Sequence, residues 1–180
     1  WRKWWRPLGK ISMRWSYWLN QHRVEDVEKT FEGIVQTRRQ LLMQWAEQQW
    51  AYLRSLARDV EKNWPNLSGE FLAIACTLHK EASEIFIIDT QHKVLHSSAA
   101  AHQGQRDLNA QACAAGMREP FLHGPYPDPL TRTLGATTSS FHDDMTLMFY
   151  HPLRVNGAVV GCLCVRIPND VMSDIIQREA

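Results

Sequence analysis

Two apolar runs on either side of Asn156-Gly157 form the clearest pattern in the 180-residue chain. The segment MTLMFYHPLRVNGAVVGCLCVRI, which ends at Ile167, is rich in β-branched and aromatic residues on both sides of this dipeptide. Asn-Gly between such runs is the strongest short-range signal for a two-residue β-hairpin. We therefore predict a hairpin in which Val155 pairs with Ala158.

Counting back from the turn assigns a face to each side chain of this hairpin, because successive residues of a strand point to opposite sides of the sheet. An antiparallel pair with one solvated face alternates apolar and polar residues, whereas both faces here are largely apolar. Each face therefore needs a cover, and we expect a long helix on one side and loops around a cavity on the other. The predicted partners are Leu153 with Val160, His151 with Cys162, Phe149 with Cys164 and Leu147 with Arg166.

Apolar residues recur every three or four positions between Gln21 and Asn63, which is the period of an amphipathic α-helix. Such a helix is roughly 60 Å long at ~1.5 Å per residue, so it must extend beyond its own domain or meet another copy. Because Arg38 interrupts the stripe, we expect the helix to lie on the sheet at one end and to dimerise at the other. The stripe consists of Val24, Val27, Phe31, Ile34, Leu41, Trp45, Tyr52, Leu56 and Val60.

The remaining segments alternate between short helices and strands. Ser68 is a predicted N-cap of a second helix, and Pro168-Asn169-Asp170 precedes a last one. The order predicts an α+β fold with a long N-terminal helix packed on a five-stranded antiparallel sheet. The other predicted elements are strands at 84–89, 93–97 and 121–126, a small helix at 107–117 and a polar, turn-rich loop at 130–144. The predicted parts are a Trp-rich basic segment (1–20), a dimerisation helix (21–64), an α+β domain (65–167) and an exit helix (168–180).

The formal net charge of +1 gives no electrostatic argument for binding nucleic acid. The first eighteen residues hold five of the eight Trp, mixed with Lys and Arg. This mixture is typical of a membrane-interface segment, and equally of a helix that packs on a partner. No apolar run is long enough to span a bilayer. Because the chain starts on Trp and stops within a predicted helix, we expect it to be an excerpt of a longer protein.

The predicted hairpin places His151 opposite Cys162, with Cys164 two residues further on the same face. These are soft ligands that suit zinc or copper, so one interpretation is a metal or redox sensor. The other is a buried core, because cysteine is among the most buried residue types. The sequence contains no nucleophile with its base, no Gly-rich phosphate loop and no metalloprotease helix. We therefore expect neither an enzyme nor a cofactor.

Several longer sequence segments resemble those of a known protein family. The segment EIFIIDTQHKVLHSS after a long helix resembles the opening of Cache (PAS-like) sensor domains. Three later segments resemble the sensory region of bacterial methyl-accepting chemotaxis proteins: FLHGPYPDPLT, SSFHDDMTLMFYHPL and GCLCVRIPNDVMSDIIQREA. The resemblance implies a module without catalysis that binds a small molecule between a sheet face and its loops. It also implies a homodimer through the long helix and a signalling domain, or a second sensor module, beyond the exit helix.

The position of the family's usual transmembrane helix holds WRKWWRPLGKISMRWSYW, which Lys and Arg interrupt. This departure and the unpaired cysteines favour a cytoplasmic location of the domain, whereas the usual location in the family favours the periplasm. The side of the membrane therefore stays open.

Polar groups in the loop before the hairpin, together with the hairpin itself, form the predicted ligand site. The alternative is that Tyr126-Pro-Asp-Pro is turn chemistry and that the Cache-like module is a scaffold with a filled pocket. Carboxylates there suit an amine or a metal, whereas Arg118 and Arg132 suit a carboxylate; the sequence does not choose. The candidate ligand-binding residues are Tyr126, Asp128, His142, Asp143, Thr146, Met148 and Tyr150.

Overall fold

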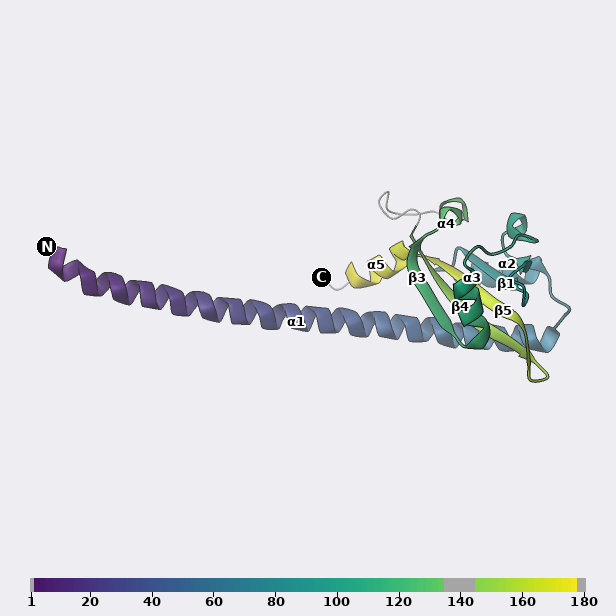
Figure 1. Cartoon of the computed structure of the whole chain (residues 1–180), viewed down its shortest axis with the longest axis horizontal. Helices are drawn as coiled ribbons and strands as arrows, with labels where there is room; N and C mark the ends of the chain where they lie inside the picture. Colours follow the sequence, from purple (N-terminus) through teal and green to yellow (C-terminus); the bar gives the residue numbers. More distant parts are fainter. Residues whose placement is uncertain (1, 135–144, 178–180) are drawn as a thin grey trace. The chain divides into compact units, whose positions relative to one another are not determined.

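The computed structural model describes the backbone of residues 2–134 and 145–177, and the side chains of residues 25–131 and 145–177. The chain forms two compact units, Trp1–Gln44 and Trp45–Ala180. Helix α1 (Arg2–Asn63) begins nineteen residues before the predicted Gln21 and ends at Asn63 as predicted (Figure 1). The side chains of the Trp-rich segment lie outside the described residues. Whether this segment contacts a membrane or a partner helix therefore stays a prediction.

The second unit is built on one five-stranded antiparallel sheet, which confirms the predicted α+β fold. The strands are β1 (Glu84–Ile88), β2 (Val94–Ser97), β3 (Phe121–Pro127), β4 (Met145–Val155) and β5 (Ala158–Pro168), in the order β2-β1-β5-β4-β3. The other elements are α2 (Gly69–Leu78), the short η1 (Ala100–His102), α3 (Ala110–Arg118), α4 (Pro129–Leu134) and α5 (Asn169–Gln177). Ser68 caps α2 as predicted, since its hydroxyl accepts a hydrogen bond from the Phe71 amide.

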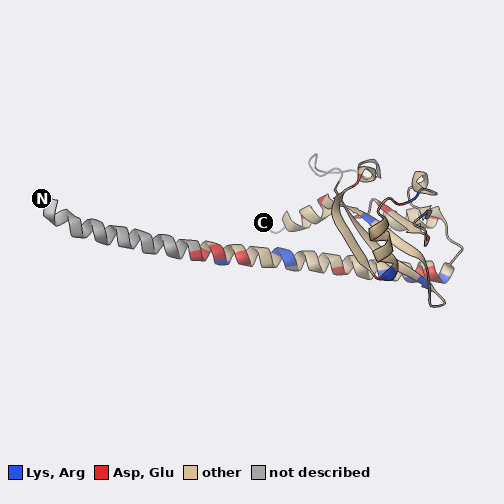
Figure 2. Ribbon diagram, viewed as in Figure 1, with Lys and Arg blue, Asp and Glu red and all other residues tan. Residues whose placement is uncertain are grey.

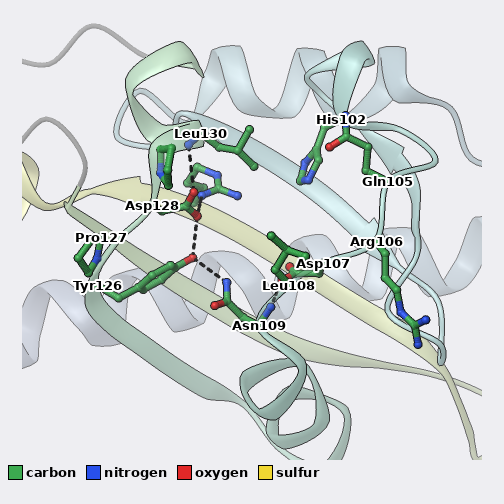
Figure 3. A pocket seen from close by; sticks show the side chains of 12 residues that line it. His102, Gln105, Arg106, Asp107, Leu108, Asn109, Tyr126, Pro127, Asp128 and Leu130 are labelled. Atoms are coloured by element: carbon green, nitrogen blue, oxygen red, sulfur yellow. Dashed lines mark hydrogen bonds and ion pairs between the residues drawn. The ribbon is translucent and has the colours of Figure 1, made fainter.

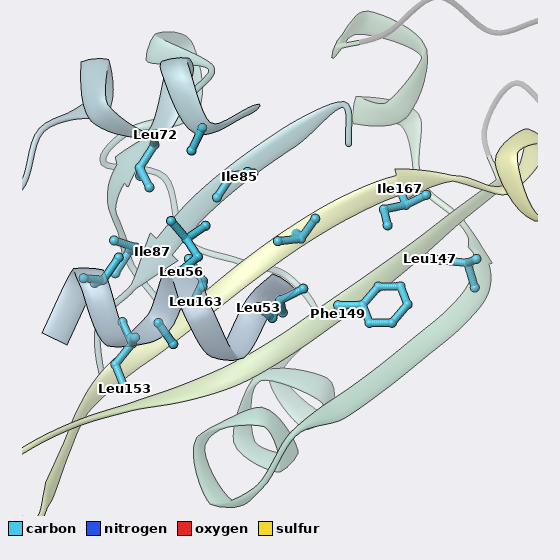
Figure 4. Packing of buried hydrophobic residues seen from close by; sticks show 14 of the residues in the cluster. Leu53, Leu56, Leu72, Ile85, Ile87, Leu147, Phe149, Leu153, Leu163 and Ile167 are labelled. Carbon is cyan, nitrogen blue, oxygen red and sulfur yellow. The ribbon is translucent and has the colours of Figure 1, made fainter. Parts of the chain in front are cut away.

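One face of the sheet packs on the last turns of α1 and on α2 (Figure 4). Leu53 and Val60 of α1 are fully buried there, and Phe149 lies against the rings of Trp45 and Trp50, with centroids 5.8 and 5.0 Å away. Alternate residues of the strands supply the sheet side of this layer, among them Ile85, Ile87, Leu147, Leu163 and Ile167. The apolar stripe of the helix is therefore a core stripe from Trp45 onward.

The opposite face packs on α3 and on the loop that precedes it. Phe86, Met148 and Tyr150 are fully buried in this layer. Helix α3 approaches closely because Gly116 has no side chain: a Cβ there would lie 2.4 Å from the Tyr150 Cβ atom. Both faces of the hairpin are thus covered, one by a long helix and the other by a short helix and loops, as the apolar pattern predicted.

The predicted register of the hairpin holds for two pairs and then fails. Val155 pairs with Ala158 and Arg154 with Val159, but Leu153 pairs with Gly161. Val160 is therefore an extra residue in β5, and this β-bulge shifts the rest of the strand by one position. The predicted partners Leu153–Val160, His151–Cys162, Phe149–Cys164 and Leu147–Arg166 are wrong; the structure pairs Leu153 with Gly161, His151 with Leu163, Phe149 with Val165 and Leu147 with Ile167.

The bulge also contradicts the alternative of a metal or redox site and favours the buried core. Cys162 and Cys164 lie in the layer under α3, whereas His151 alternates with Phe149 and Leu153 on the face toward α1. The three side chains therefore point to opposite sides of the sheet. Among the described residues, no group of three His, Cys, Asp or Glu side chains could hold a metal ion.

The segment 130–144, predicted as loop, begins with helix α4. Asp128 starts this helix, because its carboxylate accepts a hydrogen bond from the Leu130 amide (3.0 Å). The short helix follows a close approach of β3 to β4 at Gly124. Glycine is required here because its φ is +113° and a Cβ would lie 2.5 Å from the Thr146 carbonyl oxygen.

The first unit consists of the helical residues up to Gln44. Figure 2 shows acidic and basic residues interspersed along its described part, and large apolar side chains are exposed beside them. No helix of the described residues is long and apolar enough to cross a membrane. The exposed apolar residues are Val27, Phe31, Ile34, Val35 and Met43.

Candidate ligand-binding site

A cavity of about 180 Å³ opens on the α3 side of the sheet. Three parts of the chain line it: residues 102–109 between η1 and α3, residues 126–130 from β3 into α4, and Arg166 of β5 (Figure 3). The lining mixes charged, amide and phenol groups with the apolar side chains of Leu108 and Leu130. A few convergent polar groups in an apolar setting are the usual composition of a small-molecule site.

Backbone hydrogen bonds hold the loop 102–109 against β2. The amide of Val94 donates to the Gln105 carbonyl oxygen (2.8 Å), and the Asp107 amide donates to that of His92 (2.9 Å). The Asp107 carboxylate in turn accepts a bond from the Asn109 amide (2.8 Å) just before α3. This side of the cavity is therefore preformed.

Arg166 is the centre of the ionic contacts below the cavity. Its side chain is 2 % exposed, and its Nε donates to the Glu84 carboxylate (3.0 Å). Its Nη1 donates to the Asp128 carboxylate. Glu84 stands directly opposite Arg166 in the β1–β5 pairing, so the sheet register itself sets this ion pair.

Glu84 also connects the arginine to the loop side of the cavity. Its carboxylate accepts a hydrogen bond from the Ser97 hydroxyl (2.7 Å) and contacts Nδ1 of His102. The His102 ring packs edge-on against Phe86, with centroids 5.0 Å apart. The network thus runs continuously from η1 through β1 and β5 to the start of α4.

Burial and pairing act in opposite directions on these charges. Burial alone would raise the pKa of Glu84, but the His102 hydrogen bond and the Arg166 charge outweigh it and leave this pKa below its usual value. Burial likewise would raise the pKa of Asp128, and the Arg166 charge lowers it overall. Burial would lower the pKa of Arg166, whereas its two carboxylate partners raise it. All three groups are therefore ionised near neutral pH.

Tyr126 and Asn109 extend the network along the cavity wall. The Tyr126 hydroxyl donates to the Asp128 carboxylate (3.0 Å), and the Asn109 amide nitrogen donates to the same hydroxyl (3.5 Å) (Figure 3). Burial raises the pKa of Tyr126 far above its usual value, so its hydroxyl keeps its proton. Tyr126 is thereby fixed as a donor to Asp128.

The candidate residues from the sequence have different positions in the structure. Tyr126 and Asp128 border the cavity. Thr146, Met148 and Tyr150 lie buried on the same face without lining it; Thr146 contacts the Thr131 hydroxyl. His142 and Asp143 lie outside the described residues.

The loop residues Asp107 and Asn109 were missed in the sequence. Glu84, His102 and Arg166 of the ionic network were missed as well. An arginine inside the apolar run GCLCVRI is a signal of a buried ion pair, since Arg is almost never buried unpaired. Its partners could not be named, because they lie 82 and 38 residues away in the chain.

No protein-family model and no curated protein sequence matches the chain. Solved structures do match. The sensory domain of the Campylobacter jejuni chemoreceptor Tlp3 with isoleucine bound aligns over 81 % of this chain and 60 % of its own, at 15 % identity and a TM-score of 0.62. The chain has the fold of a chemoreceptor sensory domain.

Two other solved structures are similar with lower TM-scores. The ligand-binding domain of the Pseudomonas aeruginosa chemoreceptor PctB in complex with L-Arg aligns over 76 % of this chain and 55 % of its own, at 14 % identity and a TM-score of 0.53. An extracellular ligand-binding receptor from Desulfohalobium retbaense aligns over 77 % of this chain and 26 % of its own, at 15 % identity and a TM-score of 0.57. The chain thus spans about 60 % of the Tlp3 sensory domain.

Proposed function

We propose that this chain is the ligand-sensing part of a bacterial chemoreceptor and binds a small molecule in the cavity above Arg166. The observation that carries the proposal is a preformed cavity whose walls come from the loop 102–109, β3 and β5, with ionised groups at its base. The fold supports it, because the similar solved domains are sensory or ligand-binding domains. At about 180 Å³, the cavity suits a ligand smaller than a drug-sized molecule, for which pockets measure roughly 300–1,000 Å³.

The position of Arg166 supports a route for the signal. Strand β5 ends at Pro168, and helix α5 begins at Asn169. A ligand that changes the contacts of Arg166 therefore acts on the strand that leads into the exit helix. The ligand can shift the exit helix only if it binds two states of the network with different affinities, and this difference limits the size of the shift in the equilibrium.

The thermal unfolding of the chain against a panel of amino acids, amines and organic acids tests the proposal. Binding to the native state alone stabilises by about 2.7 kcal/mol at a hundredfold excess over Kd. This corresponds to a rise in Tm of about 5 to 11 °C for a chain of this size. A cooperatively unfolding protein that no compound stabilises would contradict sensing and leave a scaffold as the function.

A matched pair of variants locates the site. Tyr126→Phe removes the hydroxyl that binds Asp128, and we expect it to weaken the binding of any hit. Tyr52→Phe removes a hydroxyl that bonds the Ala75 carbonyl oxygen on the other side of the sheet, and we expect it to leave binding unchanged. Equal effects of both variants would place the site elsewhere.

We also propose that the chain dimerises through the exposed apolar stripe of α1. Val27 and Phe31 are each 66 % exposed, and they follow the three-and-four spacing of a coiled-coil seam. Phe31→Glu should convert a dimer into a monomer in light scattering, whereas Gln36→Glu, on the other side of the same helix, should not. A wild-type monomer at high concentration would refute this proposal and leave ligand binding untouched.

A further inference from the structure

Helix α2 presents an apolar stripe to solvent. Phe71, Ile74 and Leu78 follow one another at intervals of three and four residues, and their exposed fractions are 36, 58 and 78 %. Side chains at this spacing lie on one face of a helix. Among the described residues of the second unit, only two other large apolar side chains, Leu108 and Leu122, are exposed. The stripe is therefore the main concentration of exposed apolar surface in the described part of this unit.

The opposite face of α2 attaches the helix to its neighbours. Leu72 is fully buried and Ala75 is 8 % exposed, and the Ala75 carbonyl oxygen accepts a hydrogen bond from the Tyr52 hydroxyl (3.2 Å). At the first turn the backbone lies so close to β2 that a Cβ at Gly69 would be 2.9 Å from the Ser97 carbonyl oxygen. The stripe is therefore held in place, so covering it costs little conformational freedom.

The stripe is separate from the ligand cavity. Helix α2 packs on the sheet face that α1 covers, through Leu72 and Ala75 (Figure 4). The cavity opens on the other face, and none of the three stripe residues lines it. A partner that covers the stripe therefore does not compete with a ligand in the cavity.

The charges at the two ends of α2 have opposite signs. Glu70 is exposed in the first turn, and Lys80 is exposed two residues after the helix ends at Leu78. When two copies of one helix lie antiparallel about a two-fold axis, the first turn of each copy meets the last turn of the other. Glu70 of each copy then faces Lys80 of the other copy, whereas a parallel pair brings like charges together. The face is therefore self-complementary in the antiparallel arrangement.

The same charges distinguish a second copy from other occupants of the stripe. A helix that lies on a membrane surface carries Lys and Arg beside its apolar face. Helix α2 contains no basic residue, and its first turn is acidic. Self-complementary charge favours a second copy of the chain over an unrelated protein, because an unrelated surface has no reason to match both ends.

We propose that α2 is a self-association surface, at which two copies of the chain meet antiparallel through Phe71, Ile74 and Leu78. This contact is distinct from the proposed contact through α1, whose exposed apolar residues belong to the first unit. A helix of ten residues is about 15 Å long, so the contact is smaller than the roughly 800 Å² per partner of a standard interface. The association is therefore weak and reversible.

Sedimentation equilibrium of the full 180-residue chain, at concentrations up to about 1 mM, tests this surface. All proteins carry Phe31→Glu, which removes the proposed α1 contact. We expect this background protein to associate reversibly, and added Ile74→Glu to lower the association constant about tenfold or more, because a charge is buried without a partner. Ala114→Glu adds the same charge at an exposed position of α3 and should have no effect. A background protein that stays monomeric, or equal association of the Ile74→Glu and Ala114→Glu proteins, overturns the proposal.

Charge reversal tests the antiparallel arrangement. In the same background, Glu70→Lys and Lys80→Glu should each lower the association constant about two- to tenfold at low salt, where exposed charges are least screened. The double variant restores opposite charges and should recover the association. A folded double variant without recovery overturns the antiparallel arrangement. Because the stripe lies outside the cavity, Ile74→Glu should leave the rise in Tm with a ligand unchanged, which separates failure of this proposal from failure of sensing.

Discussion

Replacing Arg166 with Met tests the ionic network below the cavity. The change keeps most of the side-chain length but removes the cation, so Glu84 and Asp128 remain buried without it. Removing one partner of a buried ion pair costs about 3–5 kcal/mol. For a chain of this size, each kcal/mol lowers Tm by about 2–4 °C, so we expect Tm to fall by roughly 6–20 °C.

The loss should also depend on pH, with a defined sign. The wild-type pKa values of Glu84 and Asp128 lie below their usual values, so their pairing stabilises the fold above the unfolded pKa of about 4 and is lost as pH falls through the folded values. Without Arg166, both pKa values rise relative to wild type, because burial is then opposed only by His102 and Ser97 at Glu84 and by Leu130 and Tyr126 at Asp128. The difference in unfolding free energy between Arg166→Met and wild type should therefore shrink from pH 7 towards pH 4.

Urea unfolding of both proteins at several pH values measures this difference. Arg154→Met is the control, because Arg154 is exposed and bonds only the Arg118 carbonyl oxygen among the described residues. We expect it to change stability by no more than about 0.5 kcal/mol. A loss below about 1 kcal/mol for Arg166→Met, or the same loss at pH 7 and pH 4.5, would refute the reasoning.

Three further predictions concern other parts of the chain. Gly116→Ala should cost about 1–3 kcal/mol in urea unfolding, because its Cβ would lie 2.4 Å from Tyr150 Cβ; Gly33→Ala, with nothing within 4 Å, should stabilise instead. Ser68→Ala should cost about 1 kcal/mol through the lost cap of α2, and an unchanged midpoint would contradict that role. Leu108, which is 95 % exposed at the cavity rim, should tolerate Ala within about 0.5 kcal/mol of stability, and titration calorimetry should show weaker binding of ligands with an alkyl chain.

The sequence predicted the hairpin turn and the existence of every strand, because these depend on local signals. Asn156 and Gly157 have φ values of 52° and 78°, which is the backbone that a primed turn requires. The bulge at Val160 was not predicted, although Gly161 was a signal: an isolated glycine within a strand often marks a bulge or a close backbone approach. A Cβ at Gly161 would lie 2.4 Å from the Ile88 carbonyl oxygen.

The candidate site was predictable only in part, for a different reason. Tyr126 and Asp128 stood out because polar residues concentrate in the segment before the hairpin. Glu84 and Arg166 meet only because β5 inserts between β1 and β4. That strand order is a property of the whole sheet, and the spacing of residues in one segment contains no information about it.

The bulge and the cavity are physically connected through Arg166. In the uninterrupted register, Arg166 would pair with Leu147 and point to the face that packs on α1, where its charge would lie in an apolar layer. The extra residue Val160 rotates the following part of β5, so that Leu163, Val165 and Ile167 enter that layer instead. Arg166 then points to the other face, where it meets Glu84 and Asp128. One inserted residue near the turn therefore both keeps a charge out of the helix-side core and places it at the base of the cavity.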